Sequence, residues 1–180
     1  MEEEIKLPAP SLDGVRRRLA EQGGRCVRPR SLERNWVLDD GRGSLRAGSR
    51  LLRLRTTDAD ARLTLKGPAT FSGPVKRREE VETTVGDVDA ALAVFAGLGY
   101  SVVRRYEKYR EEWTIAGVTV TLDETPAGDF VEVEGPAARL EASVRHIGLD
   151  PATAVSGTYL DIWSAYRRRH PDAPEDMVFG

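Results

Sequence analysis

Apolar and polar residues alternate along several segments of the chain, and this period of two is typical of β-strands. The first such segment, residues 2–7, reads Glu-Glu-Glu-Ile-Lys-Leu. Similar segments follow, each bounded by glycine or proline. We therefore predict seven further strands, over residues 26–39, 51–56, 61–66, 75–85, 101–115, 118–124 and 129–134. Two Gly-Pro pairs make residues 67–74 a predicted loop.

Other segments repeat apolar residues every three or four positions, which predicts helices. Ser11 is a suitable N-cap for the first helix, and the glycines at 23 and 24 end it. Further helices are predicted over residues 87–98 and 136–147, and a last helical segment over 156–169. Three glycines between residues 40 and 50 predict a turn-rich link. We expect one domain, residues 1–180, with a helical C-terminal segment from about residue 156.

Charged residues in the predicted strands occur at every second position, so they share one face of each strand. Arg53 and Arg55 show the pattern, with Leu52 and Leu54 on the opposite face. The bases at such positions are Lys6, Arg53, Arg55, Lys66, Arg78, Lys108 and Arg110, and the acids are Glu2, Glu4, Glu80, Glu82, Asp123, Glu132 and Glu134. In an open sheet these faces would simply be solvated. Closing about eight such strands into a barrel would instead gather the charges in one lumen, with helices outside.

Composition excludes several other classes of protein. The chain carries 31% charged and 40% hydrophobic residues, typical of a soluble globular protein. Its net charge of -2 provides no overall field for nucleic acid, and its longest uncharged run, residues 90–103, is shorter than a membrane span. The acidic start is unlike a secretory signal, so we expect a cytoplasmic protein. With one cysteine and two histidines, any metal site would consist of oxygen ligands.

A lumen of this kind has a definite chemistry. Clustered carboxylates repel one another unless they are protonated or bridged by a hard cation such as Mg²⁺ or Mn²⁺. Clustered Arg and Lys side chains repel one another unless an anion lies between them, and phosphate suits both guanidinium and ammonium groups. The ligand that satisfies both sets of charges is a metal-bound oligophosphate, a small molecule.

Six motifs occur in an order that resembles the CYTH superfamily, also called the triphosphate tunnel metalloenzymes. They are Glu2-x-Glu4-x-Lys6, Leu52-Arg53-Leu54-Arg55, Leu63-Thr64-Leu65-Lys66-Gly67-Pro68, Arg78-x-Glu80-x-Glu82, Lys108-x-Arg110 and the segment from Gly128 to Glu134. The resemblance extends from Glu2 to about Tyr166. It implies an α+β fold in which an eight-stranded antiparallel β-barrel encloses a tunnel, and Mg²⁺- or Mn²⁺-dependent reactions on triphosphates.

The resemblance also implies roles for individual residues. Phosphate would contact Lys6, Arg53, Arg55, Lys66, Lys108 and Arg110, whereas Arg78 would contact either the substrate or the carboxylates. Glu2, Glu4, Glu80, Glu82, Asp123, Glu132 and Glu134 would bind the metal or orient the bases, with Glu132 and Glu134 the first choice for the metal. Because lysine can lose its proton and arginine cannot, Lys6, Lys66 or Lys108 could activate water. The alternative is that these lysines only clamp phosphate.

Three functions fit these features. The leading hypothesis is a metal-dependent phosphohydrolase acting on inorganic triphosphate or an organic triphosphate. The second is a class IV-type adenylate cyclase, which converts ATP to cyclic AMP and pyrophosphate. The segment Ser156 to Leu160 resembles the C-terminal segment of members with that label, whereas Glu33-Arg34-Asn35-Trp36 lacks the consecutive aromatics of cyclase-like members. The third is a non-catalytic module that binds polyphosphate or nucleotides. The sequence leaves open a homodimer.

Overall fold

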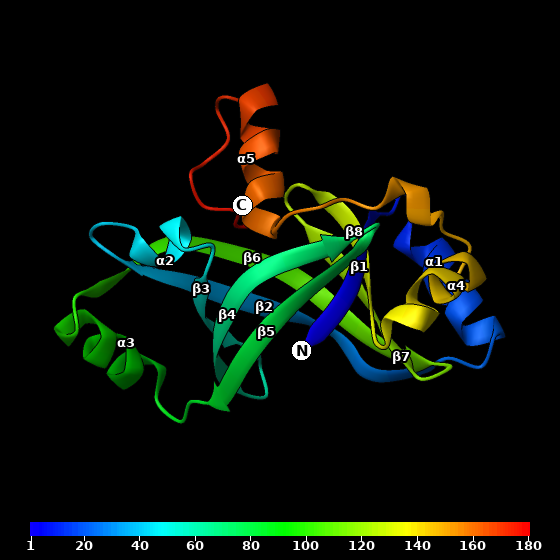
Figure 1. The fold of residues 1–180 in the computed structure, drawn as a ribbon, viewed down its shortest axis with the longest axis horizontal. Coiled ribbons are helices and arrows are strands. Elements are labelled where there is room, and N and C mark those ends of the chain that lie inside the picture. The colour runs from blue at the N-terminus through cyan, green and yellow to red at the C-terminus, as the bar shows by residue number, and fades with distance from the viewer.

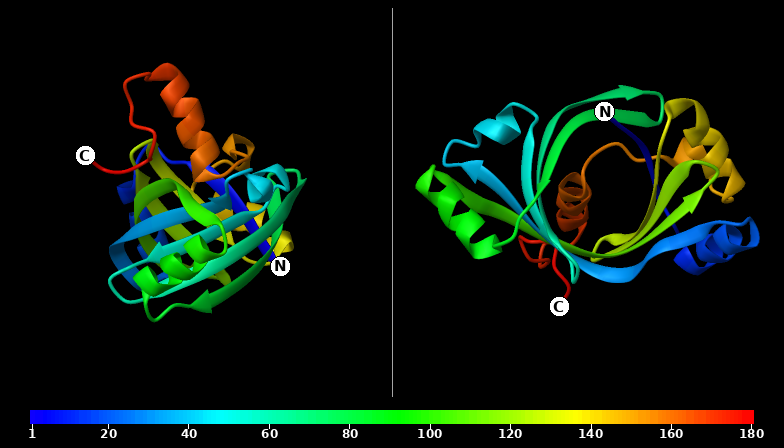
Figure 2. Two further views of the ribbon diagram at one scale, coloured as in Figure 1. Left: turned by 90° about the vertical axis from the view of Figure 1, so that its left-hand side faces the viewer. Right: turned by 90° about the horizontal axis from the view of Figure 1, so that it is seen from below.

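Eight strands close into one antiparallel barrel in the computed structural model, which describes residues 1–180 (Figure 1). The strands are β1 (Glu2–Pro8), β2 (Arg25–Asp40), β3 (Leu51–Thr56), β4 (Ala61–Ser72), β5 (Val75–Thr84), β6 (Tyr100–Ile115), β7 (Val118–Thr125) and β8 (Gly128–Glu134). Their order around the barrel is β1-β5-β4-β3-β2-β6-β7-β8. Seen from below, they form a closed, flattened ring (Figure 2, right). The predicted barrel is therefore confirmed.

Helices lie outside this ring in three groups (Figures 1 and 2). The helices are α1 (Leu12–Glu21), α2 (Ser44–Ala47), α3 (Val88–Gly97), α4 (Ala137–His146) and α5 (Tyr159–Arg169), with a short 3-10 turn at Pro151–Thr153. Helices α1 and α4 lie together on one side, α2 and α3 lie on the other, and α5 stands at one end of the barrel. None of the five combines the length and the apolar composition that crossing a bilayer would need.

Most of the hydrophobic core lies between the barrel and its helices. Ile5, Val120 and Val133 point outward from β1, β7 and β8 and are fully buried. Leu19 of α1 and Leu140 of α4 cover them in the largest apolar cluster. A smaller cluster joins α2 and α3 to the outer faces of β2 and β3. A third cluster lies under α5 at one end of the barrel, where Tyr106 and Phe130 share the inward faces of their strands with charged residues of the tunnel. Because side chains alternate along each strand, burying the apolar set outside turns the charged set inward.

One local prediction is wrong, and another gains a short helix. The predicted loop over residues 67–74 is mostly strand, because β4 continues to Ser72 and pairs with β5 beyond a bulge between Lys66 and Ala69. Pro68 has no N–H to donate to the ladder, so the Gly-Pro pair indicates a bulge here, not the end of the strand. The turn-rich link between β2 and β3 contains the short helix α2, whose first turn is held by the carboxylate of Asp39. That carboxylate accepts hydrogen bonds from the backbone N–H groups of Leu45 and Arg46 at 2.9 and 3.0 Å.

The C-terminal segment completes the barrel wall beside β6. The first half of β6 pairs with β2 alone, because its pairing with β7 begins only at Tyr109. After α5 the chain returns to this free edge, where Met177 is fully buried. The backbone N–H of Glu107 donates to the carbonyl of Met177 at 2.8 Å, and the N–H of Met177 donates to the carbonyl of Arg105 at 3.1 Å. The last residues are thus fixed to the barrel.

Candidate active site

The inward-facing side chains line a cavity of about 580 Å³ that follows the barrel lumen, called the tunnel below. Basic and acidic side chains make up most of its lining. Every base and every acid predicted from the sequence lies on this lining, with the exception of Asp123. Asp123 is fully buried behind the lining, and its carboxylate accepts a hydrogen bond from Lys108. The rule that alternate strand positions share a face therefore places the charged side chains correctly.

One wall of the tunnel carries a dense network of ion pairs. The carboxylate of Asp123 accepts hydrogen bonds from Lys108 Nζ at 3.1 Å and from Arg110 Nε at 2.7 Å. Arg110 also pairs with Glu132, whose other oxygen lies 3.2 Å from Lys6 Nζ. Burial raises the pKa of Glu132, but the charges of Arg110, Lys6 and Lys108 outweigh it and hold that pKa well below its ordinary value. Glu132 is therefore an ionised carboxylate.

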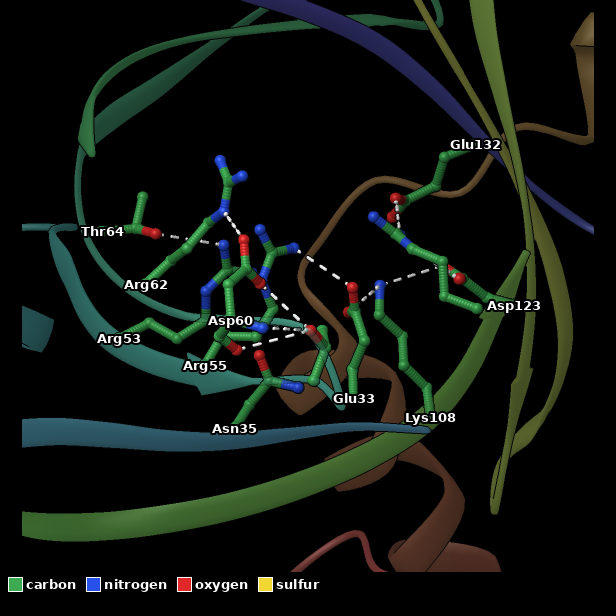
Figure 3. Close-up of polar contacts among 12 residues, drawn as sticks. Glu33, Asn35, Arg53, Arg55, Asp60, Arg62, Thr64, Lys108, Asp123 and Glu132 are labelled. Atoms are coloured by element: carbon green, nitrogen blue, oxygen red, sulfur yellow. Dashed lines mark hydrogen bonds and ion pairs between the residues drawn. The ribbon is translucent and has the colours of Figure 1, made fainter. Parts of the chain in front are cut away.

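Glu33 of β2 lies beside this network, directly across the β2–β6 pair from Lys108 and between Lys108 and Arg55 (Figure 3). Its carboxylate oxygens are 3.3 Å from Arg55 Nη1 and 3.6 Å from Lys108 Nζ. Burial raises its pKa, but the charges of Lys108, Arg110, Arg55 and Arg53 lower it to about 2. Glu33 thus places a permanent negative charge among the bases.

Some donors in the tunnel have no protein partner. Arg53 is buried, and its guanidinium donates to the hydroxyl of Tyr106 and to Thr64 Oγ1, each at 3.3 Å. Its Nε remains without a partner, as does the hydroxyl of Thr121 across the lumen. A buried polar group without a partner is costly, so these atoms favour a polar ligand in the tunnel.

Carboxylates gather where β1, β5 and β8 meet. Glu4 lies directly opposite Glu134 across the β1–β8 pair. Burial, together with the neighbouring charges of Glu2, Glu4 and Glu132, raises the pKa of Glu134 to about 7. Burial and a hydrogen bond with Glu80 also raise the pKa of Glu2. The local excess of negative charge therefore favours either a proton or a cation.

The same group of carboxylates fits a hard divalent cation by its chemistry, because all of its donors are oxygens. In the present arrangement no three of them converge on one point, since bases hold several of them apart. Lys66 Nζ lies 3.2 Å from Glu2 and also contacts Glu80, and Lys76 Nζ lies 2.8 Å from Glu4. Binding a cation would require these pairs to open.

Arg78 and Glu82 lie in the tunnel with contacts of their own. Arg78 donates to the backbone carbonyls of Gly67 and Ser49, the latter at 3.1 Å, so it joins β5 to β4 and to the segment before β3. Glu82 accepts hydrogen bonds from Arg62 and from Thr64 Oγ1, both at 2.8 Å. Both residues therefore have structural partners in addition to any ligand.

Several tunnel residues are absent from the sequence-based set. Arg62 and Lys76 follow the same every-second-residue spacing and could have been found by extending it along β4 and β5, whereas Glu33 lies on β2, where no site residue was predicted. Tyr106 accepts a hydrogen bond from Arg53 through its hydroxyl oxygen. Tyr159 enters the lining from α5, outside every strand, and no strand pattern could have indicated it.

A second cavity of about 870 Å³ adjoins the tunnel and shares Leu51, Lys76, Arg78 and Thr158 with it. Its rim includes four further arginines, Arg42, Arg46, Arg50 and Arg104. Apolar side chains such as Phe71 and Leu160 form part of its wall. This cavity could receive a group larger than phosphate attached to a ligand in the tunnel.

Several solved structures share this fold. The chain is similar to a candidate adenylate cyclase from Vibrio parahaemolyticus, with a TM-score of 0.80 and 22% identity over 91% of this chain and 97% of that one. A protein from Pyrococcus horikoshii has a TM-score of 0.76 and 24% identity, covering 93% of this chain and 100% of its own. A candidate adenylyl cyclase from Hippeastrum, described as having a dominant triphosphatase activity, has a TM-score of 0.70 and 20% identity over 92% and 96% of the two chains.

Comparisons of sequence alone give two results. No curated protein matches this chain. A family model described as the CYTH domain matches residues 4–144, which include all eight strands apart from the first residues of β1.

Proposed function

This chain belongs to the CYTH domain family, and we propose that it is a divalent-metal-dependent phosphohydrolase acting on an inorganic or organic triphosphate in the tunnel. The observation that carries the proposal is the gathering of bases from β1, β3, β4, β5 and β6 in one lumen beside a cluster of carboxylates. A triphosphate supplies several negative oxygens along a line, which such a lumen can contact from all sides. The family is one of enzymes, in agreement with this proposal.

The proposed phosphate ligands are Lys6, Arg53, Arg55, Lys66, Lys108 and Arg110, with Arg78 as a further contact. Arg53 has the strongest individual support, because its buried Nε has no partner in the protein. Apart from Arg78, the other bases already pair with carboxylates, so phosphate would take the place of some of those partners. Such exchange keeps these bases neutralised before and after binding.

Glu2, Glu4, Glu80, Glu132 and Glu134 are the proposed holders of Mg²⁺ or Mn²⁺. Such an ion, when bound, neutralises charge on the phosphate oxygens during in-line phosphoryl transfer. Glu82 is a less favoured candidate, because its carboxylate already accepts hydrogen bonds from Arg62 and Thr64. For Asp123, its buried contacts with Lys108 and Arg110 support the orienting role in preference to direct coordination.

The lysines are proposed both to bind phosphate and, in one of the three cases, to assist the attacking water. Burial lowers the pKa of Lys6, but Glu132 and Glu4 outweigh it and raise that pKa above its ordinary value. A lysine that holds its proton this firmly favours the clamp role for Lys6. Lys66 and Lys108 then remain the candidates for proton transfer. Replacing each lysine by Arg in turn distinguishes the two roles, since Arg keeps the charge and cannot accept a proton.

The direct test incubates purified protein with Mg²⁺ or Mn²⁺ and either tripolyphosphate or ATP, and quantifies phosphate, pyrophosphate and cyclic AMP together. We expect metal-dependent phosphate release that Glu132→Gln abolishes. Glu124→Gln is the matched control, because Glu124 lies on the outer face of the neighbouring strand β7 and pairs with Arg30. Equal release by wild type and Glu132→Gln would contradict the proposal and indicate a contaminating phosphatase.

Cyclisation of ATP is the second candidate, and the cavity beside the tunnel favours it because a nucleoside needs space outside the phosphate site. The name of the Vibrio parahaemolyticus neighbour points the same way, whereas the activity described for the Hippeastrum protein favours hydrolysis. Cyclic AMP with pyrophosphate would reverse the ranking. A triphosphate that raises the melting temperature without any product would instead support a binding module.

A further inference from the structure

The beginning of α5 forms part of the tunnel wall, although it belongs to no strand. Thr158 and Tyr159 both line the tunnel. The hydroxyl of Tyr159 donates to Asp123 Oδ2 at 2.5 Å. The face of its ring lies 4.1 Å from Lys6 Nζ and 4.8 Å from Lys108 Nζ, measured to the ring centroid. One side chain from the C-terminal segment thus contacts two of the three lysines and their buried carboxylate.

The strands that carry these two lysines are not hydrogen-bonded to each other in the barrel. Lys6 lies on β1 and Lys108 on β6, and the strands β8 and β7 separate them in the barrel. The only backbone group that holds Lys6 Nζ is the carbonyl of Gly157 at 3.2 Å, two residues before Tyr159. An aromatic ring attracts ammonium groups to its face, and the attraction is strongest where water is excluded. Tyr159 is therefore the one side chain that contacts both lysines, in addition to the chain of ion pairs that joins them through Glu132, Arg110 and Asp123.

Tyr159 is itself held firmly. Thr158 caps α5 in a reciprocal capping box with Asp161. Further along the helix, Trp163 Nε1 donates to the carbonyls of Pro174 and Glu175, both at 3.2 Å, which ties α5 to the segment that pairs with β6. Phe130 packs against the Tyr159 ring edge-on with centroids 5.6 Å apart. Only the face towards the lysines and the hydroxyl contact polar groups.

We propose that Tyr159 is a positioning residue of the tunnel, which holds the ammonium groups of Lys6 and Lys108 where they contact the substrate's phosphate oxygens. It acts through its ring on both lysines and through its hydroxyl on Asp123, which in turn holds Lys108 and Arg110. This inference rests on the proposed function, since it assumes that these lysines bind triphosphate. A residue with this role changes substrate affinity more than the chemical step.

The test compares Tyr159→Met, which fills the space without a ring, with Tyr159→Phe, which loses only the hydroxyl. We expect Tyr159→Met to raise the KM for tripolyphosphate about tenfold, with a smaller change in kcat. Tyr159→Phe should raise KM about threefold, because it keeps the ring. Tyr166→Met is the matched control, since Tyr166 lies on the same helix but stacks between Trp163 and His170, away from the tunnel. Its KM should stay within about twofold of wild type.

A wild-type KM in Tyr159→Met would overturn the proposal. If that variant does not fold, Tyr159→Phe decides in its place, and an unchanged KM there would overturn it equally. A general loss of structure would lower the melting temperature and affect Tyr159→Met and Tyr166→Met alike. A KM for Tyr159→Phe between those of wild type and Tyr159→Met would show that the ring and the hydroxyl both contribute.

A second measurement does not depend on turnover. The chain has four lysines, Lys6, Lys66, Lys76 and Lys108, so carbon-13 labelling of lysine gives four ε-methylene signals by NMR. The ring of Tyr159 should move the proton signals of Lys6 and Lys108 upfield, and Tyr159→Met should return them to ordinary positions. If wild type shows this pair of upfield signals but does not hydrolyse triphosphate, the proposed function is wrong, but the placement of the Tyr159 ring over Lys6 and Lys108 is supported. If the upfield pair is absent in an active wild type, the positioning role fails alone.

Discussion

Glu33→Gln is a direct test of how the tunnel's charges contribute to stability. Glu33 is 1% exposed, and its carboxylate faces Arg55 and Lys108. The surrounding bases lower its pKa from an ordinary 4.5 to about 2, in spite of burial. The amide of Gln is nearly the same size but carries no charge, so the substitution removes the electrostatic term with little change in packing.

The pKa difference sets the magnitude. A lowering from 4.5 to about 2 corresponds to about 3 kcal/mol of folding free energy that depends on the ionised carboxylate. Because the folded-state pKa is the lower one, this stabilisation is present above about pH 4.5 and is lost as the pH falls towards 2. The difference in unfolding free energy between wild type and Glu33→Gln should therefore be about 3 kcal/mol at pH 7 and about 1 kcal/mol at pH 3.

Urea unfolding, followed by tryptophan fluorescence at several pH values, measures this difference. Glu124→Gln serves again as the control, since its partly exposed pair with Arg30 should contribute less than about 1 kcal/mol at every pH. A difference below about 1 kcal/mol for Glu33→Gln at pH 7 would refute the electrostatic reasoning. An equal difference at pH 7 and pH 3 would also refute it, because it would mean that packing and not charge is responsible.

Three further predictions concern other parts of the molecule. Asp123→Asn should cost about 3–5 kcal/mol in urea unfolding, because it removes the buried carboxylate that Lys108 and Arg110 share, and a cost below about 1 kcal/mol would contradict this. In metal-free buffer Glu134→Gln should melt above wild type at pH 8, with a smaller advantage at pH 5, because the raised pKa of Glu134 destabilises the folded state progressively as the pH rises from about 4.5 to 7; a lower melting temperature at pH 8 would oppose it. Leu140→Ala should lose about 2–5 kcal/mol of stability but keep its KM for tripolyphosphate, and a changed KM would contradict the separation of core and tunnel.

The sequence predicts the barrel and the charged lumen because both follow from one local rule. Residues i and i+2 of a strand share a face, so Arg53 and Arg55, or Glu132 and Glu134, reveal their common direction without any knowledge of distant contacts. The same rule limits the prediction at Gly67-Pro68, where a bulge keeps the strand going although the residue types indicate a loop. Local pattern cannot distinguish a break from a bulge.

The contacts of Asp123 and Tyr159 depend on geometry that no local pattern contains. Asp123 follows the inward spacing of β7, but whether it reaches the cavity or lies beneath the bases depends on the curvature of the wall. Tyr159 reaches the tunnel because a segment 150 residues after Lys6 packs across one end of the barrel. Such contacts are set by tertiary packing, which is why sequence spacing could indicate the charges but not how they are held.

The position of the largest apolar cluster outside the barrel has a consequence for how this protein can change. Residues that stabilise the fold, such as Leu140 and Val133, point away from the lumen, whereas residues that meet a ligand point into it. Consecutive residues of one strand therefore experience separate selection, one for stability and the next for ligand choice. Variation at inward positions near the second cavity, such as Leu51, can alter the accepted leaving group with little effect on folding. The barrel wall makes the fold a suitable starting point for evolving new triphosphate specificities.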